Sequence, residues 1–321
     1  QDELKFNVGP ENGTAATEFI LEGFSGLDQR LQLFLSLVLL LLYLTTVMGN
    51  TAIIFLVCVD RRLQTFMYFF ISNLAFLEIW FTSSTSIKFI VVLGSGRRTI
   101  SLSSCFAQSC FYFALGCASC LFFLLSCPLT ATWIICQPLH YAAIMKPQLC
   151  IYLVVAAWAT GSTLLSYHLV LLSKLTFCGS NKIHHFFCDN YPLFKLSCSD
   201  TNLLWKMDSV FLSFVIVGSL SLTLAFYMAI LSCVLHLPAA SGRKKVLTTC
   251  SSHLTTLATA YGSCIALYTR PSEEVSLKTN RIVALLNTVL YPFLNPFIYS
   301  LRNKSVRLVL NETTARTTAK L

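Results

Sequence analysis

The chain has 321 residues, of which 55% are hydrophobic and 12% are charged, and its formal net charge at pH 7 is +9. Soluble globular proteins carry about twice this share of charged residues. The composition therefore excludes an ordinary soluble domain and indicates a membrane protein.

The first element, residues 1–30, is polar and is predicted to form an extracellular N-terminal tail. Whether segment 1–10 is native or an added piece stays open from the sequence. Asn12 begins an Asn-Gly-Thr acceptor pattern for N-glycosylation, and we predict that it is the site used. Asn303 and Asn311 begin two further patterns near the other end, so this signal alone does not orient the chain.

Seven apolar stretches follow, each long enough for the roughly 20 residues that cross a bilayer core. They are 31–59, about 64–93, 99–145, 147–173, 209–242, 246–269 and 282–301. The second contains Glu78 and Lys88, and the third includes a loop near Pro138. Lipid leaves no backbone polar group unpaired, and a β-barrel would show short alternating segments, so the spans are predicted to be helices. We expect an all-α bundle of seven transmembrane helices over 31–301, and a cytoplasmic tail with a short amphipathic helix over 302–321.

Cysteines orient the bundle, because Lys and Arg divide equally between its two sides. Cys178, Cys188 and Cys198 lie in one polar loop between the fourth and fifth spans, and Cys105 begins the third span on the same side. Disulfides persist in oxidising compartments, so we expect this face and the N-terminus to be outside. Four cysteines allow three pairings, which the residues alone leave open. The other cysteines lie in or near spans, where they act as small apolar residues.

Polar side chains inside the spans are costly and are therefore candidates for function. The main ones are Asn50, Glu78 and Asn295. Pro296 follows Asn295 and bends the helix, which frees a backbone carbonyl group that the amide can bind. The alternative is that these residues only join helices to one another, and the residues alone favour neither interpretation.

Signatures of an enzyme are missing, since the chain has no HExxH, no GxSxG and no pair of intramembrane aspartates. His184 and His185 near the loop cysteines suggest zinc, but thiols consumed in disulfides cannot bind it. A single Glu is a poor proton relay, so a channel or transporter is only a remote alternative. We expect no enzyme, no cofactor, no metal and no nucleic-acid partner.

Several different short motifs occur along the chain in a definite order. They are Glu18-Phe19-Ile20-Leu21, Gly49-Asn50, Met67 to Leu74, Cys136 to Tyr141, His185 to Asp189, Leu196 to Asp200, Thr249 to Leu254, Tyr261-Gly262 and Pro292 to Asn303. Together they cover about residues 17–310, and with them the chain resembles a vertebrate odorant receptor, a branch of the rhodopsin-like (class A) G-protein-coupled receptors.

The resemblance implies pairings and roles that the residues alone left open. It implies disulfides from Cys105 to Cys188 and from Cys178 to Cys198, and location in the plasma membrane as a multi-pass protein. It also implies a polar hub and switch made of Asn50, Glu78, Tyr227, Tyr261, Asn295 and Tyr299. The family often has a second acid on the third span, but Ser119 stands there, so the resemblance gives little support for sodium at Glu78.

The resemblance also implies a ligand site in the outer half of the bundle. The matching positions are Tyr112, Phe113, Gly116, Cys117, Phe211, Val215, Tyr261, Cys264, Tyr268 and Thr288. This set is aromatic and weakly polar and has no charge, so it suits a small, neutral, hydrophobic and volatile ligand. The other partners implied are a stimulatory, olfactory-type G protein and the membrane lipids.

One segment departs from the family pattern. Relatives carry Asp-Arg-Tyr about six residues before Cys136, where this chain has Leu129-Thr130-Ala131-Thr132-Trp133, and Pro128 falls inside the span. The distance from Cys105 to Cys136 is also one residue longer than usual. Codons such as CTG ACC GCT ACC TGG encode the observed residues and, in a shifted frame, Asp-Arg-Tyr-Leu. The alternative function is therefore a pseudogene-like receptor fold with weak or no G-protein coupling.

Overall fold

The computed structural model describes residues 18–24, 26–125, 132, 136, 146–178, 180–236, 254, 257–259, 261–265, 281–301 and 304–318. Six helices in these ranges are long and apolar enough to cross a membrane. The predicted sixth span, 246–269, lies mostly outside the described residues, but those it includes, such as Tyr261, are helical. The predicted helical membrane bundle is thereby confirmed, while the outer position of the N-terminus stays a prediction.

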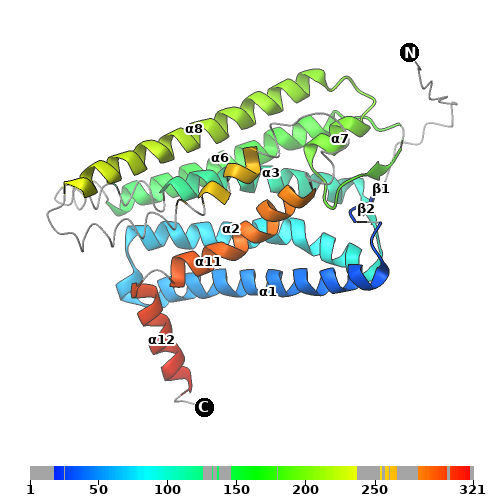
Figure 1. Ribbon diagram of the computed structural model, residues 1–321. Coiled ribbons are helices and arrows are strands. Elements are labelled where there is room, and N and C mark those ends of the chain that lie inside the picture. The colour runs from blue at the N-terminus through cyan, green and yellow to red at the C-terminus, as the bar shows by residue number, and fades with distance from the viewer. Residues whose placement is uncertain are drawn as a thin grey trace.

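The described residues form the helices α1 (Gln29–Val59), α2 (Phe66–Ser95), α3 (Leu102–Leu124), α6 (Pro147–Ser173), α7 (Asn190–Leu196), α8 (Asn202–Leu235), α11 (Tyr291–Leu301) and α12 (Lys304–Thr318), with a 3-10 turn η1 (Arg61–Leu63) and a π-helical turn η3 (Leu286–Leu290). The long helices α1, α2, α3, α6 and α8 run roughly along one axis, while α12 points away from the bundle (Figure 1).

Local signals explain where several helices begin and end. Asp28 caps α1 by accepting from the N–H of Arg30, and Ser101 caps α3 by accepting from the N–H of Ser104. Pro147 occupies the first turn of α6, where its missing N–H costs nothing. Gly96 ends α2 at φ +69°, a left-handed conformation that glycine adopts without strain.

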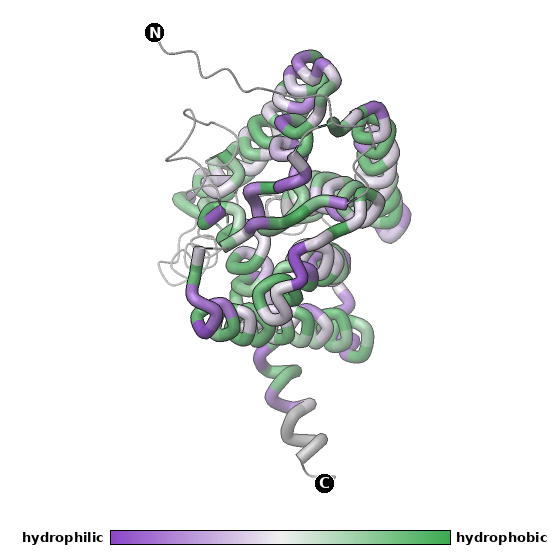
Figure 2. The backbone as a smooth tube through the Cα atoms, turned by 90° about the vertical axis from the view of Figure 1, so that its right-hand side faces the viewer, coloured by the Kyte–Doolittle hydropathy of each residue, from purple (hydrophilic) through white to green (hydrophobic). Residues whose placement is uncertain are grey.

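The bundle buries little of its outermost helices. On α1, Phe34, Leu41 and Met48 are 60%, 65% and 70% exposed, and on α8 Phe214 is 76% exposed. Large apolar side chains in such numbers are the face that a bilayer covers. Figure 2 views the bundle end-on, and hydrophilic stretches cross between helices that are mostly hydrophobic.

A close approach between α1 and α11 depends on glycine. A Cβ on Gly49 would lie 2.8 Å from Pro296 Cβ, which is closer than real atoms pack. The Gly49-Asn50 pair therefore lets the first and last spans touch, next to the kink-prone Asn295-Pro296 step.

A small sheet covers one end of the bundle, a feature that the all-α prediction did not include. Its strands β1 (Glu18–Leu21), β2 (Thr99–Ser101) and β3 (Lys182–Ile183) lie in the order β2-β1-β3. β1 pairs antiparallel with β2 and parallel with β3. The sheet joins the N-terminal segment to the segments that contain β2 and β3. Its residues Phe19, Leu21 and Ile183 are fully buried.

Two cysteine pairs lie at this end. The Cα atoms of Cys105 and Cys188 are 5.4 Å apart, and those of Cys178 and Cys198 are 6.0 Å apart, with each pair of sulfur atoms bonded. Both distances lie in the range of disulfides, and the pairs are those that the resemblance implies.

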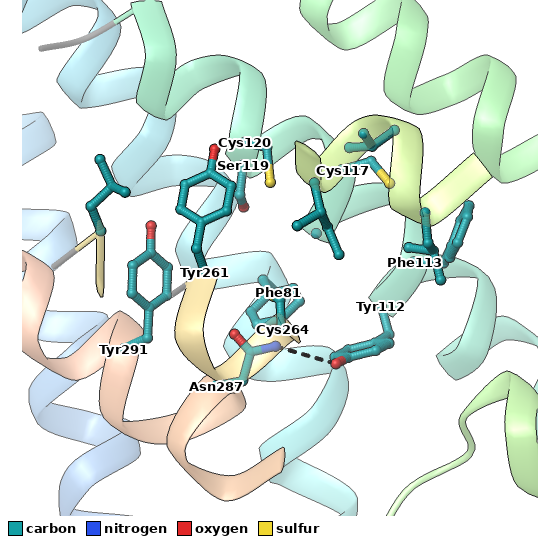
Figure 3. Close-up of a pocket in the computed structure, with 15 residues that line it drawn as sticks. Phe81, Tyr112, Phe113, Cys117, Ser119, Cys120, Tyr261, Cys264, Asn287 and Tyr291 are labelled. Carbon is teal, nitrogen blue, oxygen red and sulfur yellow. Dashed lines mark hydrogen bonds between the residues drawn. The ribbon is translucent and has the colours of Figure 1, made fainter. Parts of the chain in front are cut away.

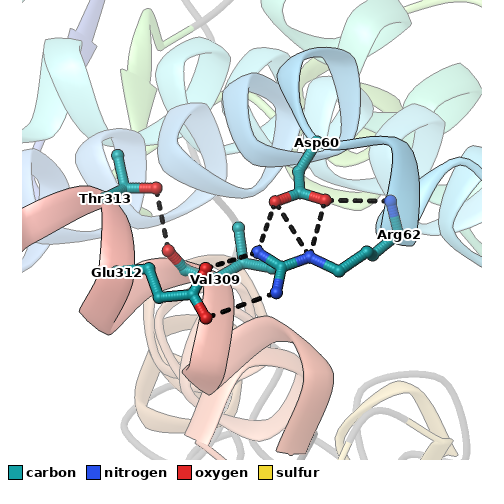
Figure 4. A network of polar contacts seen from close by, with 5 residues as sticks. All are labelled: Asp60, Arg62, Val309, Glu312 and Thr313. Carbon is teal, nitrogen blue, oxygen red and sulfur yellow. Dashed lines mark hydrogen bonds and ion pairs between the residues drawn. The ribbon is translucent and has the colours of Figure 1, made fainter. Parts of the chain in front are cut away.

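The last helix, α12, packs on the C-terminal end of α1 through two valines and an arginine. Val306 and Val309 are buried against the core. Arg62 forms ion pairs with Asp60 at 2.8 Å and with Glu312 at 2.7 Å (Figure 4). Hydrogen bonds to these two carboxylates raise the pKa of the Arg62 guanidinium above its usual range. The predicted C-terminal amphipathic helix thus has an apolar face on the bundle and an ion pair with the loop between α1 and α2.

Candidate ligand cavity and polar hub

A cavity opens in the middle of the bundle, between α2, α3, α8, the helical residues around Tyr261, and the start of α11 (Figure 3). Its empty volume, which includes space open to solvent, is about 790 Å³. Its walls are Phe81, Tyr112, Phe113, Gly116, Cys117, Ser119, Cys120, Leu212, Val215, Ile216, Leu257, Tyr261, Cys264, Asn287 and Tyr291.

Most of the ligand residues expected from the resemblance lie in this lining. They are Tyr112, Phe113, Gly116, Cys117, Val215, Tyr261 and Cys264. Phe211 lies one layer behind, where its ring is 5.9 Å from the ring of Phe113. Tyr268 lies outside the described residues. Ligand contact by these residues stays a prediction.

Thr288 does not line the cavity, and the neighbouring Asn287 takes that place. The hydroxyl of Thr288 donates to the carbonyl oxygen of Ala284 at 2.8 Å, and Thr288 is 1% exposed. Both residues lie in the π-helical turn η3, which holds one more residue than an α-turn and so rotates the side chains that follow. No feature of the sequence marks this turn, and Thr288 was expected only because its position matches the family's ligand site.

The described lining has no Asp, Glu, Lys or Arg, so the cavity can offer dispersion contacts and a few hydrogen bonds but no ion pair. The amide of Asn287 donates to the hydroxyl of Tyr112 at 3.4 Å. The buried hydroxyl of Tyr261 makes no hydrogen bond within the described part of the chain, and Ser219 and Thr223 lie near it. A ligand with one hydrogen-bonding group would therefore meet it at Tyr261 or at the Tyr112–Asn287 pair.

The three intramembrane polar residues, Asn50, Glu78 and Asn295, lie close to one another next to the cavity. The amide of Asn295 donates to the carboxyl group of Glu78, and Asn50 lies beside the same carboxyl group. All three side chains are at most 1% exposed. Tyr291 lines the cavity and also lies next to Asn295 and Glu78, so it joins the cavity to this cluster.

The remaining switch residues are placed only in part. Tyr227 is buried in the core on α8, in the same apolar cluster as Tyr261. The side chain of Tyr299 lies outside the described residues, as do Asn12, Pro128 and all of 129–133 except Thr132.

Ser119, which stands where relatives have a second acid, donates to the carbonyl oxygen of Leu115 at 2.9 Å and lines the cavity. It supplies no charge to Glu78. Within the ranges that the structure describes, no three His, Cys, Asp or Glu side chains lie close enough to share a metal ion. His184, which is exposed, instead contacts the carboxylate of Glu22 at 2.5 Å.

A third pair of cysteines was not expected from the sequence, which assigned both residues to apolar packing. Cys136 and Cys233, at the opposite end of the bundle from the sheet, have Cα atoms 5.6 Å apart and sulfur atoms at bonding distance. Thr132 also reaches α8 there, because its hydroxyl donates to the carbonyl oxygen of Phe226 at 3.4 Å. Thr132 and Cys136 therefore both contact α8.

Comparisons with known proteins agree with the resemblance. Residues 39–316 match the olfactory receptor family. The chain is 44% identical over 302 residues to olfactory receptor 6E1 of Mus musculus, an alignment that covers 94% of this chain and 96% of that relative. It is 43% identical over 299 residues to olfactory receptor 6F1 of Homo sapiens, covering 93% of this chain and 96% of the relative. Olfactory receptor 6X1 of Homo sapiens is 41% identical over 301 residues, covering 94% and 96%.

Proposed function

Because the chain belongs to the olfactory receptor family and is a multi-pass membrane protein rather than an enzyme, we propose that it binds a small, neutral, hydrophobic odorant in the central cavity. We further propose that it signals through a heterotrimeric G protein of the stimulatory, olfactory type. The family implies an odorant and a G-protein partner, and the chemistry of this cavity supports the narrower ligand class.

The observation that carries the ligand class is the uncharged lining of the cavity. Phe81, Tyr112 and Phe113 offer aromatic surface, and no residue of the described lining could neutralise a charged ligand. Burying an unpaired charge costs several kcal/mol, so an ionised odorant would bind poorly. A ketone, aldehyde, ester or alcohol that accepts from Tyr261 fits this lining.

The link from the cavity to the hub supports a route for activation. Tyr291 touches both, and Asn295 precedes Pro296 on the same helix. An odorant that binds better when Tyr291 is displaced would shift the equilibrium toward that arrangement by its differential affinity. The inner end of α11 would then move relative to α1 and α2.

The test is a cyclic-AMP reporter assay in cells that express the full chain, with a panel of neutral volatile compounds and an antibody readout of surface expression. The matched variant is Thr130→Asp/Ala131→Arg/Thr132→Tyr, which restores the family triplet. We expect saturable responses from both proteins, stronger in the restored variant. Good surface expression with no response from either protein to any compound would contradict the proposal.

A second candidate function is favoured by the altered segment 129–133, namely a receptor fold that binds odorants without coupling. It predicts a response from the restored variant only, with equal odorant binding by both proteins. If the segment arose by paired frameshifts around residues 120–134, the coding DNA will contain Asp-Arg-Tyr in a nearby shifted frame. DNA without such a frame rules out this origin.

A further inference from the structure

A second cavity lies beside the first, between α7 and the start of α8, at the end of the bundle that carries the sheet. Its empty volume is about 530 Å³. Its walls are Asp189, Asn190, Tyr191, Phe194, Trp205, Asp208, Ser209, Leu212 and Ser213. Leu212 lines both cavities, so the two adjoin at this side chain.

A buried network holds Asn190 in one orientation at the wall of this cavity. Its amide oxygen accepts from the hydroxyl of Ser109 at 2.7 Å and from Nε2 of His168 at 2.5 Å. Its amide nitrogen donates to Oδ2 of Asp208 at 3.1 Å. The two donors on one side and the carboxylate on the other fix which end of the amide faces Asp208.

Asp208 is left with half of its hydrogen-bonding capacity unused. The residue is 9% exposed, and its second oxygen, Oδ1, is buried without a hydrogen-bond partner among the described residues. The described lining contains a second acid, Asp189, and no Lys or Arg. Hydrogen-bond donors and a positive charge both stabilise a buried carboxylate, so this cavity suits a cation that can donate a hydrogen bond.

Aromatic rings complete a site for such a cation. The rings of Tyr191 and Trp205 meet nearly at right angles, with centroids 5.5 Å apart, and Phe194 forms a third wall. The faces of aromatic rings attract ammonium groups, and an acid beside two rings is a common arrangement for binding them.

We propose that this cavity is a second ligand site, which binds a primary ammonium group on Asp208, beside the edge-to-face pair of Tyr191 and Trp205. The N–H donates to the carboxylate of Asp208, which also compensates the charge, and the short alkyl part contacts the rings and Leu212. The central cavity, which has no charge, takes a neutral ligand, so the two sites select different chemistry.

Two sources can supply the primary ammonium group. Trp205 is 40% exposed and Ser213 is exposed, so the cavity opens on the outer side of α8, whose neighbouring apolar residues are exposed for lipid contact. A free amine can enter there, and so can the headgroup of phosphatidylethanolamine. Because Leu212 is shared, occupation of this site is expected to change the affinity of the central cavity for an odorant.

The experiment uses the purified full chain in nanodiscs of phosphatidylcholine and phosphatidylglycerol, titrated with butylamine, with binding measured by calorimetry. We expect saturable binding, at least about tenfold weaker for tetramethylammonium, which has no N–H to donate. Repetition with phosphatidylethanolamine in the nanodiscs separates the sources, because competition with butylamine identifies the lipid headgroup and its absence identifies the free amine.

Variants localise the site. Asp208→Asn keeps the shape and removes the charge, and it should weaken butylamine binding by at least about tenfold. Trp205→Ala, which changes a half-exposed ring at the mouth, should weaken it without disturbing the buried network. The control is Asp200→Asn, in the exposed acid that precedes α8 and lies outside the cavity lining. Unchanged binding in Asp208→Asn, equal loss in Asp200→Asn, or no saturable binding by the wild type would overturn the proposal, whatever the outcome for the central cavity.

Discussion

At the scale of single residues, Gly116 leaves room in the wall of the central cavity. A Cβ built there would lie 3.8 Å from its nearest neighbour, the ring of Phe81, so a larger residue fits the fold and occupies ligand space. A Cβ on Gly218 of α8 would meet no atom of the described neighbouring residues within 4 Å, and Gly218 lies outside the lining. The same substitution at the two glycines therefore distinguishes the loss of ligand space in the cavity from an effect on the helix.

We predict that Gly116→Val lowers odorant potency by about tenfold or more, because a single methylene in an apolar site already changes binding by about 1–3 kcal/mol and valine adds a whole isopropyl group. Gly218→Val should leave potency unchanged while carrying the same helix cost. Dose–response curves in the reporter assay, normalised to surface expression, measure both. Equal potency of the two variants would place the odorant elsewhere.

Glu78 gives a second prediction at this scale. Glu78→Gln keeps an oxygen that accepts from the amide of Asn295, whereas Glu78→Leu leaves that buried donor unpaired. Polar contacts between membrane helices are each worth about 1–2 kcal/mol, so the Leu variant should unfold at a lower temperature than the Gln variant. Thermal unfolding of the two purified proteins in detergent measures this difference. A Leu variant as stable as the Gln variant would refute a stabilising role for the contact between Glu78 and Asn295.

At the scale of elements, the cysteine pairs lie at opposite ends of the bundle. Cys105 and Cys188 join α3 to the loop before α7, while Cys136 and Cys233 join the segment after α3 to the end of α8. Disulfides persist outside the cell and are rare in the cytosol. If the sheet end is outside, the two pairs meet different redox conditions.

We predict that in cells Cys105 and Cys188 are alkylated only after reduction, whereas Cys136 and Cys233 are alkylated without it. Acid quenching, alkylation under denaturing conditions, reduction and a second isotopic label, followed by mass spectrometry, distinguish the two. Cys178 and Cys198 serve as the internal control for the oxidised state. Labelling of Cys136 only after reduction would mean that this end of α8 is cross-linked or faces an oxidising compartment.

At the scale of the whole molecule, the orientation of the bundle can be tested with the sequons at its two ends. Asn12 precedes α1, and Asn311 lies in α12. With the N-terminus outside, treatment with a glycosidase should shift the mobility of the wild type, and Asn12→Gln should abolish that shift. Asn311→Gln should leave it intact. A shift that depends on Asn311 would invert the orientation.

Sequence reasoning anticipated the bundle and most of the cavity for identifiable reasons. Long charge-free stretches such as 31–59 can only be membrane helices, because lipid offers no partner for backbone groups. Tyr112, Gly116 and Tyr261 were assigned by their match to family motifs, and all three line the cavity. The π-turn, which places Asn287 rather than Thr288 in the lining, left no mark in the sequence.

The sequence by itself determined that this chain lies in a membrane, that its spans are helices, and that it resembles an odorant receptor, because hydropathy and motif order are properties of the chain. Tertiary structure alone decided which residues share a space. Leu212 separates two cavities, Arg62 joins Asp60 to Glu312, and Asp208 is buried with one oxygen unpaired among the described residues. These features depend on how the helices pack against one another, and local periodicity in the sequence does not encode that packing.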